Sequence, residues 1–243
     1  MDAILEICVD GAAGLEAARA GGADRIELCS ALSLGGLTPS AGLMGIARQQ
    51  SLPCHAMIRP RAGDFTYDES EIAQMEREIA AVAAAGLAGV VFGATRDGAL
   101  DRAVLARLVA CAAGYRLSTT LHRAIDVLRD PVAAIDAAVE LGFDRVLSSG
   151  GAPTAIEGRD TLRAMHDRAR GRIAVMAGSG IKADNAGALT ATGIREIHAS
   201  CADTQAGDDA ALARLGFAAP VTVTRADRVR ALREAIDHNI RSC

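Results

Sequence analysis

Residues 20–28 read AGGADRIEL, a helix end followed at once by a buried strand. The paired glycines suit the left-handed turn that stops a helix, and the run after them has the apolar character of a strand in a covered sheet. The same pattern recurs as GLAGVVF at 86–92, LGFDRVL at 141–147 and TGIREI at 192–197. Each copy is the helix-to-strand half of a βαβ unit, so the repeats predict a parallel sheet covered by helices.

Eight strands are predicted when the same pattern is followed outward, and each precedes a helical segment. They lie near residues 3–9, 25–29, 54–59, 89–93, 116–121, 145–149, 172–177 and 195–199. Helix starts are predicted at Thr38–Pro39, at Asp130–Pro131 and at the capping-box pairs Asp68/Glu71, Thr154/Glu157 and Thr224/Asp227. Eight such units in 243 residues predict a (β/α)8 barrel of the TIM type. A doubly wound open sheet is the rival, but DGAAG at 10–14 matches its glycine-rich fingerprint poorly.

No linker, charge block or low-complexity tract divides the chain, so we expect one domain over residues 1–243. Lys and Arg number 26 against 30 Asp and Glu, a net charge of −4, which argues against nucleic-acid binding. The sequence has neither a membrane-spanning apolar run nor a secretory signal, so we expect a cytoplasmic protein with no membrane partner. Its six scattered cysteines are expected to be free thiols. Its Ala-rich outer helices are compatible with a homodimer.

The first two predicted strands carry the same triplet, Glu6-Ile7-Cys8 and Glu27-Leu28-Cys29. In a barrel of this kind, functional residues gather at the carboxyl ends of the strands. Alternation puts the Glu and Cys of each triplet on one face, and an outward Glu would press against apolar helices, so both pairs are expected inside. Thiols so placed would suit Cu(I), although a cysteine there is equally an ordinary small core residue.

Arginines and acidic residues follow two other predicted strands. The third strand leads into Arg59, Arg61 and Asp64, and the fifth leads into His122, Arg123 and Asp126. One interpretation is an ion-paired barrel top in which Arg59 and Arg123 neutralise Glu6 and Glu27. The other is an anion site in which the arginines hold a substrate and His122, Glu27 or Asp126 moves a proton.

The last two predicted strands end in small and polar residues. Gly178-Ser179-Gly180 follows the seventh strand, where the backbone N–H groups of such barrels often bind phosphate. His198 and Ser200 close the eighth strand and add candidate substrate-binding groups. Lys182 is the only lysine and lies beyond the glycine turn, so imine chemistry is not expected.

Taken together, these strand-end phrases resemble the CutC copper homeostasis family. The matching phrases are GGADRIELC at 21–29, GGLTPS at 35–40, MIRPR at 57–61, GDF at 63–65, FGA at 92–94, HRA at 122–124 with Asp126, GFDRVL at 142–147 and EIHAS at 196–200. The resemblance implies a cytosolic TIM-type barrel with a role in copper tolerance or trafficking, in which Cys8 and Cys29 hold Cu(I). The chain departs from the family pattern at Ala62, at Ser179 and over residues 201–221.

The sequence is therefore compatible with two functions. The first is copper handling through Cys8 and Cys29, with Cu(I) as the bound metal. The alternative is an enzyme acting on a small anionic substrate, phosphorylated ones included, because the barrel top collects two further arginine-bearing loops that a copper carrier would not need.

Overall fold

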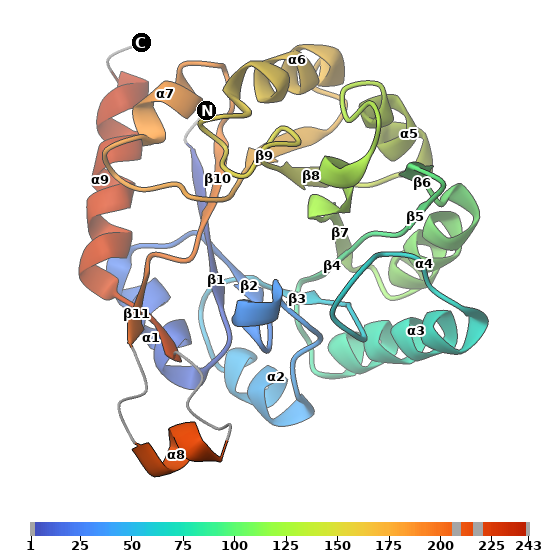
Figure 1. Ribbon diagram of the computed structural model, residues 1–243, viewed down its shortest axis with the longest axis horizontal. Helices are drawn as coiled ribbons and strands as arrows, with labels where there is room; N and C mark the ends of the chain where they lie inside the picture. Colours follow the sequence, from blue (N-terminus) through green and yellow to red (C-terminus); the bar gives the residue numbers. More distant parts are fainter. Residues whose placement is uncertain (1–2, 206–209, 216–220, 242–243) are drawn as a thin grey trace.

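The computed structural model describes residues 3–205, 210–215 and 221–241. Its centre is a closed barrel of eight parallel strands ringed by helices (Figure 1). The barrel strands are β1 (Ile4–Val9), β2 (Arg25–Leu28), β3 (Cys54–Met57), β4 (Gly89–Phe92), β7 (Ser118–Leu121), β8 (Arg145–Ser148), β9 (Ala174–Ala177) and β10 (Glu196–Ala199). They follow chain order around the barrel, and β10 closes it on β1. The predicted TIM-type (β/α)8 fold is confirmed.

Helices cover the outside of the barrel. They are α1 (Ala12–Gly21), α2 (Ala41–Ala47), α3 (Glu69–Ala84), α4 (Arg102–Gly114), α5 (Ala134–Leu141), α6 (Arg159–Ala169), α7 (Ala186–Thr190) and α9 (Ala226–Arg241). The turn between α1 and β2 forms as the sequence predicts: Gly22 is left-handed at φ +89°, its N–H donates to the Arg19 carbonyl, and the N–H of Ala23 donates to the Ala18 carbonyl. Helix α9 packs against α1 and α7, beside the seam where the barrel closes.

The predicted helix starts are only partly right. Asp68 and Glu71 form a full capping box at the start of α3. Helix α2 begins later than predicted, and its N-cap is Ser40, because the Thr38 hydroxyl is engaged elsewhere: it donates to Glu78 and accepts the Arg59 N–H.

At the other predicted starts, the helix itself begins a few residues later along the chain. Asp130 accepts the N–H of Ala133, and Thr154 accepts that of Glu157 at 3.3 Å, so both oxygens cap turns that precede α5 and α6. Thr224 ends a strand, and α9 begins only at Ala226.

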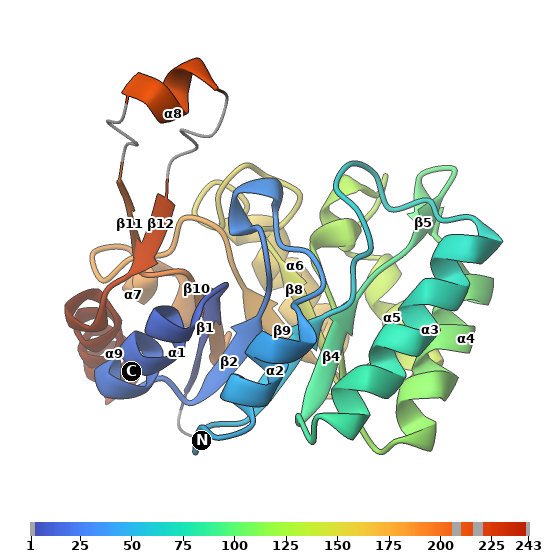
Figure 2. The same cartoon turned by 90° about the horizontal axis from the view of Figure 1, so that it is seen from below.

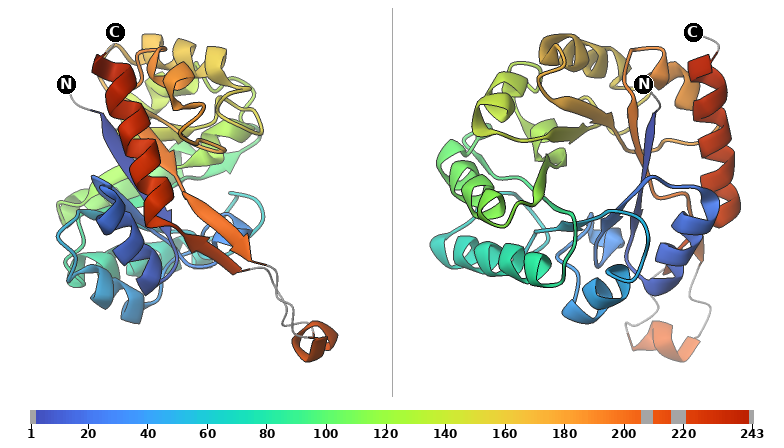
Figure 3. Two further views of the ribbon diagram at one scale, coloured as in Figure 1. Left: turned by 90° about the vertical axis from the view of Figure 1, so that its left-hand side faces the viewer. Right: turned by 180° about the vertical axis from the view of Figure 1, so that it is seen from behind.

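Two short hairpins that the sequence does not predict lie at the top of the barrel. Strands β5 (Thr95–Arg96) and β6 (Ala99–Leu100) form one of them. Strands β11 (Ala202–Gln205) and β12 (Val221–Thr224) form the other, and helix α8 (Ala210–Arg214) lies at its far end. Figures 2 and 3 show this second hairpin leaving the barrel, with α8 well away from the other helices.

The register of the barrel brings together the strands whose ends carry polar residues. Cys8 on β1 lies opposite Glu27 on β2, and Glu6 lies opposite Arg25 on β2 and His198 on β10. Because the strands are parallel, their carboxyl ends meet at one end of the barrel. No helix in the described residues is long and apolar enough to cross a membrane.

Candidate functional site

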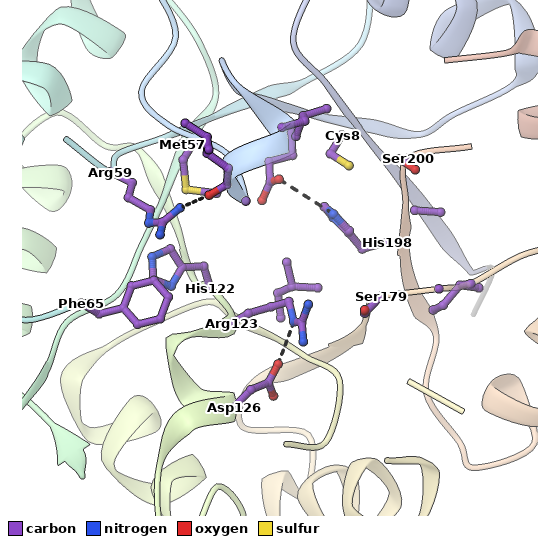
Figure 4. A pocket seen from close by; sticks show the side chains of 18 of the residues that line it. Cys8, Met57, Arg59, Phe65, His122, Arg123, Asp126, Ser179, His198 and Ser200 are labelled. Carbon is purple, nitrogen blue, oxygen red and sulfur yellow. Dashed lines mark hydrogen bonds and ion pairs between the residues drawn. The ribbon is translucent and has the colours of Figure 1, made fainter. Parts of the chain in front are cut away.

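A cavity of about 560 Å³ lies at the carboxyl ends of the barrel strands (Figure 4). The residues singled out from the sequence that line it are Cys8, Glu27, Arg59, His122, Arg123, Asp126, Ser179, Gly180, His198 and Ser200. Apolar side chains, including Met57, Phe65 and Leu147, complete the wall. Mostly apolar walls with a few convergent polar groups are typical of small-molecule sites.

A sulfur, a carboxylate oxygen and an imidazole nitrogen converge at one side of this cavity. Cys8, Glu27 and His198 each offer one ligand atom, and these atoms lie within 4.8 Å of one another. All three residues are buried. They come from β1, β2 and β10, which are adjacent only because the barrel closes between the first strand and the last. We call these three residues the Cys8 cluster.

Glu6 lies behind the Cys8 cluster and holds His198. The Nδ1 atom of His198 lies 2.8 Å from Oε1 of Glu6, and its Nε2 atom lies 3.8 Å from a Glu27 oxygen. Burial alone would lower the pKa of His198, but attraction to Cys8 and Glu27, with the hydrogen bond to Glu6, raises it well above the usual range. The Glu6 hydrogen bond therefore orients the ring and leaves Nε2 facing the other two members.

Arg25 compensates the buried charge of Glu6. Its Nε pairs with Glu6, and its Nη2 lies 2.5 Å from a Glu196 oxygen. Burial pushes the pKa of Glu6 upward, but the bonds from His198 and Arg25 outweigh it and hold the pKa well below its ordinary value. The interpretation in which Arg59 and Arg123 neutralise Glu6 is therefore wrong. Period-two alternation from Glu27 back to Arg25 was the signal that could have revealed the true partner.

A direct hydrogen bond joins Glu27 and Cys29. The Cys29 thiol donates to Oε2 of Glu27 at 3.4 Å, while Oε1 has no partner among the described residues. Burial raises the pKa of Glu27, and burial with the charge of Glu27 raises that of Cys29. Cys29 packs against Met57, and a Cβ on Gly36 would lie 3.1 Å from its sulfur. Of the two predicted thiols, only Cys8 lines the cavity.

Arg59, His122 and Phe65 form the wall opposite the Cys8 cluster (Figure 4). Among the described residues, Arg59 donates to three backbone carbonyls, those of Leu34, Gly36 and Gly63, and its charge also acts on the buried Tyr67 hydroxyl. Its Cζ lies 5.2 Å from the Phe65 ring centroid, and the His122 ring centroid lies 4.9 Å from the same point. Burial, helped by the charge of Arg59, lowers the pKa of His122 to about 3, so this ring is neutral at pH 7.

Arg123 and Asp126 sit at the cavity mouth and bind each other. Nε of Arg123 lies 2.8 Å from the Asp126 carboxylate. The same carboxylate accepts the hydroxyls of Ser148 and Ser149 and the backbone N–H groups of Ser149 and Gly151. Both oxygens of Asp126 are thus engaged in holding the loop after β8.

Arg61 and Asp64 point away from the cavity. Arg61 pairs with Asp64 at 3.0 Å and also with Glu71 at the start of α3, and neither Arg61 nor Asp64 lines the cavity. Phe65, the next residue in this loop, does line it and was not singled out from the sequence. The available signal was that this loop holds two aromatic residues, Phe65 and Tyr67, in a chain with very few of them.

The turn after β9 places Ser179 and Gly180 at the cavity edge and Gly178 behind them. A Cβ on Gly178 would lie 2.6 Å from Leu147, so close packing requires glycine there. Ser179 is left-handed at φ +85°, a conformation that few residues other than glycine adopt. Its hydroxyl donates to Pro153 at 2.8 Å, which ties this turn to the loop after β8.

The fold and the cavity define a class of protein: a TIM barrel whose polar site is built from thiol, carboxylate and imidazole groups at the carboxyl ends of adjacent strands. The chain belongs to the CutC family, whose model matches residues 3–203. A family protein CutC from Sinorhizobium medicae is 52% identical over 237 residues, covering 96% of both chains. Another from Caulobacter vibrioides is 51% identical over 221 residues, covering 89% of both. The resemblance in the strand-end phrases is confirmed.

Solved structures agree on the fold. The structure of a copper homeostasis protein CutC from Streptococcus agalactiae matches with a TM-score of 0.76 and 30% identity, covering 82% of this chain and 98% of the other. A thiamine phosphate pyrophosphorylase from Pyrococcus furiosus matches with a TM-score of 0.62 at 16% identity, covering 98% of this chain and 96% of the other. At so low an identity, the second likeness concerns the barrel alone.

Proposed function

We propose that the protein handles copper by binding Cu(I) at the Cys8 cluster. The convergence of the Cys8 sulfur, a Glu27 oxygen and a His198 nitrogen within 4.8 Å of one another is the observation that carries this proposal. Membership of a family associated with copper homeostasis supports it. Copper is then the cargo of the protein.

The donor set suits Cu(I) chemically. Thiolate is the preferred ligand of Cu(I), and imidazole is a common second ligand. A carboxylate behind a ligating histidine orients the ring and fixes which nitrogen faces the metal, and Glu6 supports His198 in this way. Glu27 is a harder ligand, which Zn²⁺ accepts more readily than Cu(I), so Zn²⁺ is the competing ion to test.

Cys29 remains the alternative second thiol. The family resemblance implies that Cys8 and Cys29 together hold Cu(I). In the described geometry the Cys29 thiol donates to Glu27, so its use as a ligand requires loss of that proton, and it is not among the three residues whose ligand atoms converge. His198 already lies close to Cys8, although with its raised pKa it too must release a proton to bind the metal. We therefore propose Cys8 and His198 as the primary ligands, with Cys29 tested separately.

The experiment is a titration of the reduced protein with Cu(I) against a chromophoric chelator. Cys8→Ser is expected to abolish stoichiometric uptake, and His198→Asn to weaken it by at least about tenfold. Cys29→Ser is expected to leave affinity nearly unchanged if His198 is the second ligand, and to abolish uptake if the two thiols share the ion.

Cys111→Ser is the matched control, because Cys111 is a free thiol on α4 and does not line the cavity. Its affinity is expected to equal that of the unaltered protein. Retention of full Cu(I) affinity by Cys8→Ser would contradict the proposal. Preferential binding of Zn²⁺ over Cu(I) in a parallel titration would contradict the assignment of the metal.

The second candidate function is an enzyme acting on a small anionic substrate. It is favoured by Arg59, a buried guanidinium that lines the same cavity, donates to three carbonyls and pairs with no carboxylate among the described residues. A thermal-shift screen of anionic metabolites, phosphorylated ones included, repeated on Arg59→Ala, tests it. A screen in which no anion raises the unfolding temperature of the unaltered protein would rule it out.

We also propose a cytoplasmic location and one domain over residues 1–243, with a homodimer as the candidate assembly. Fractionation of cells producing the tagged protein tests the first of these. Limited proteolysis tests the domain organisation, because a single domain should yield no stable fragment of intermediate size. Light scattering of the purified protein at several concentrations tests the dimer.

A further inference from the structure

Two buried donor atoms on residues of the cavity wall have no acceptor among the described residues. Arg59 is 6% exposed and His122 is 4% exposed. Within the described part of the chain, neither Nε of Arg59 nor Nε2 of His122 has a hydrogen-bond partner. Both residues line the cavity and lie against the Phe65 ring (Figure 4). Buried polar groups left unpaired are costly, so two of them side by side indicate a binding surface.

The hydrogen bond made by Nδ1 determines which nitrogen of the His122 ring carries the proton. Nδ1 accepts the backbone N–H of Ala124 at 3.1 Å, so Nδ1 carries no proton. A neutral ring must then carry its proton on Nε2. His122 therefore presents an N–H donor beside the Arg59 guanidinium, and two adjacent donors call for an acceptor between them.

Arg59 also carries a charge that the cavity does not balance. Its three hydrogen bonds all go to carbonyl oxygens, and no carboxylate in the described residues lies within ion-pair distance. Arg123, the other arginine of the lining, is neutralised by Asp126. A guanidinium has five N–H donors, so Arg59 retains two, one of them on Nε. The natural partner of such a group is an anion.

We propose that Arg59 and His122 bind the carboxylate of a small organic acid, whose carbon skeleton lies against the apolar lining of the cavity. One unbalanced positive charge and one neutral donor match a single negative charge, and a phosphate dianion would need a second cation. Met57, Leu147 and Phe65 supply apolar surface next to the two donors. A volume of about 560 Å³ accommodates a metabolite-sized acid.

This inference rests on the second candidate function and narrows its substrate class, but it is independent of copper binding. It also gives His122 a role other than the proton acceptor expected from the sequence, because its Nε2–H group donates. In this site His122 positions the acid, and the groups left to move protons are those of the Cys8 cluster on the opposite wall.

The test measures binding of simple monocarboxylates to the reduced, metal-free protein by calorimetry. The probes are acetate, butyrate, hexanoate and benzoate, with benzamide as the uncharged analogue of benzoate and phenyl phosphate as the dianion. At least one monocarboxylate is expected to bind, and benzoate to bind at least about tenfold more tightly than benzamide. Failure of all four carboxylates to bind, or equal binding of benzamide, would overturn the proposal.

Variants of Arg59 and His122 test whether these two residues bind the carboxylate. Arg59→Lys keeps the charge but loses the fork, and it is expected to weaken carboxylate binding by about tenfold or more. His122→Asn can still accept the Ala124 N–H but loses the second donor, so it is expected to weaken binding severalfold, whereas His122→Gln should restore part of the loss. Arg107→Lys, on the exposed face of α4, is the matched control and should bind normally.

The unfolding temperature of each variant is checked first, because Arg59 also ties three loop carbonyls together. If Arg59→Lys does not fold, the two His122 variants decide the question. Unchanged binding in the folded variants would overturn the assignment of these residues. Tighter, Arg59-dependent binding of phenyl phosphate would retain an anion site, and with it the second candidate function, but would overturn the carboxylate class.

Discussion

At the residue scale, the charged groups inside the barrel are arranged as one connected network. Arg25 bridges Glu6 and Glu196, and Arg145 lies 3.5 Å from the same Glu196 carboxylate. Paired charges of this kind contribute little net stability compared with apolar residues of the same size, but loss of one partner leaves the other buried and unpaired. Glu6 keeps His198 in place, so the network beneath the cavity supports the Cys8 cluster above it.

Replacing Arg25 tests this network. Arg25→Met is expected to destabilise the fold by about 3–5 kcal/mol, because the buried Glu6 loses its arginine partner and Glu196 keeps only the more distant Arg145. Urea unfolding followed by circular dichroism measures the change. Arg102→Met, which breaks an exposed ion pair with Glu140, should alter the unfolding midpoint far less. Equal losses in the two variants would show that burial of the Arg25 network has no special cost.

The pH dependence of stability has a residue-level source in His55, which lies inside the barrel on β3. Burial, with the charge of Arg145, lowers its pKa to about 4, against the attraction of Glu6. The unfolded chain binds a proton here below about pH 6.5, and the folded chain does so only near pH 4. The stability contributed by neutral His55 is therefore complete above pH 6.5 and is lost as the pH falls toward 4.

Between pH 6 and pH 5 this residue should lower the unfolding free energy by about 1.2 kcal/mol. His55→Gln removes that contribution, so its stability should fall less steeply with acidification by about the same amount. Urea titrations of both proteins at several pH values provide the comparison. Parallel slopes would mean that His55 is protonated equally in the two states.

At the element scale, the loops after the strands are held by close backbone packing. Gly158, just before α6, lies against the loop after β8: a Cβ on Gly158 would lie 1.9 Å from the carbonyl oxygen of Ser149. This contact fixes the segment whose Ser148 and Ser149 hydroxyls donate to Asp126. In contrast, a Cβ on Gly45 in α2 would meet nothing within 4 Å.

These two glycines make a matched pair of substitutions. Gly158→Ala is expected to destabilise the protein by about 3 kcal/mol or more, because backbone must move to admit the methyl group. Gly45→Ala should stabilise it by about 0.5–1 kcal/mol, since glycine inside a helix is entropically unfavourable. Thermal unfolding of both variants measures the two shifts. A neutral Gly158→Ala would indicate that the loop before α6 has room to relax.

At the scale of the whole molecule, the barrel is a closed unit to which the β11–β12 hairpin is attached. The hairpin leaves the rim next to the seam between β10 and β1, and α8 lies at its far end (Figure 2). The cavity lining includes Ser200 just before the hairpin but no residue of β11 or β12.

The outer part of this hairpin should therefore be removable without loss of the barrel or the cavity. Thr204 and Thr222 are register partners, so residues 205–221 can be replaced by an Asn-Gly turn between them. We expect the shortened protein to unfold within a few degrees of the original and to bind Cu(I) equally well, because barrel and cavity are intact. Thermal unfolding and the Cu(I) titration measure both quantities. Loss of cooperative unfolding would show that residues 205–221 stabilise the barrel.

Much of the architecture was predictable because its signals are local. The glycine stop and apolar run at residues 20–28 identify a helix end and a strand by chain geometry alone, and repetition of that pattern predicts the barrel. Period-two alternation likewise placed Glu27 inside. The two unpredicted hairpins have no comparable signal, because each strand is short and lies outside the repeating pattern.

The sequence by itself determined the fold, the end of the barrel that carries polar residues and the inward direction of Glu6 and Glu27. Only the tertiary structure decided which of these residues meet. Cys8 and Cys29 stand in identical triplets, yet Cys8 lies beside His198 in the cavity while Cys29 is covered by the loop containing Gly36. The physical reason is closure: His198 reaches Glu6 and Cys8 only when the last strand pairs with the first, and local patterns do not encode that contact.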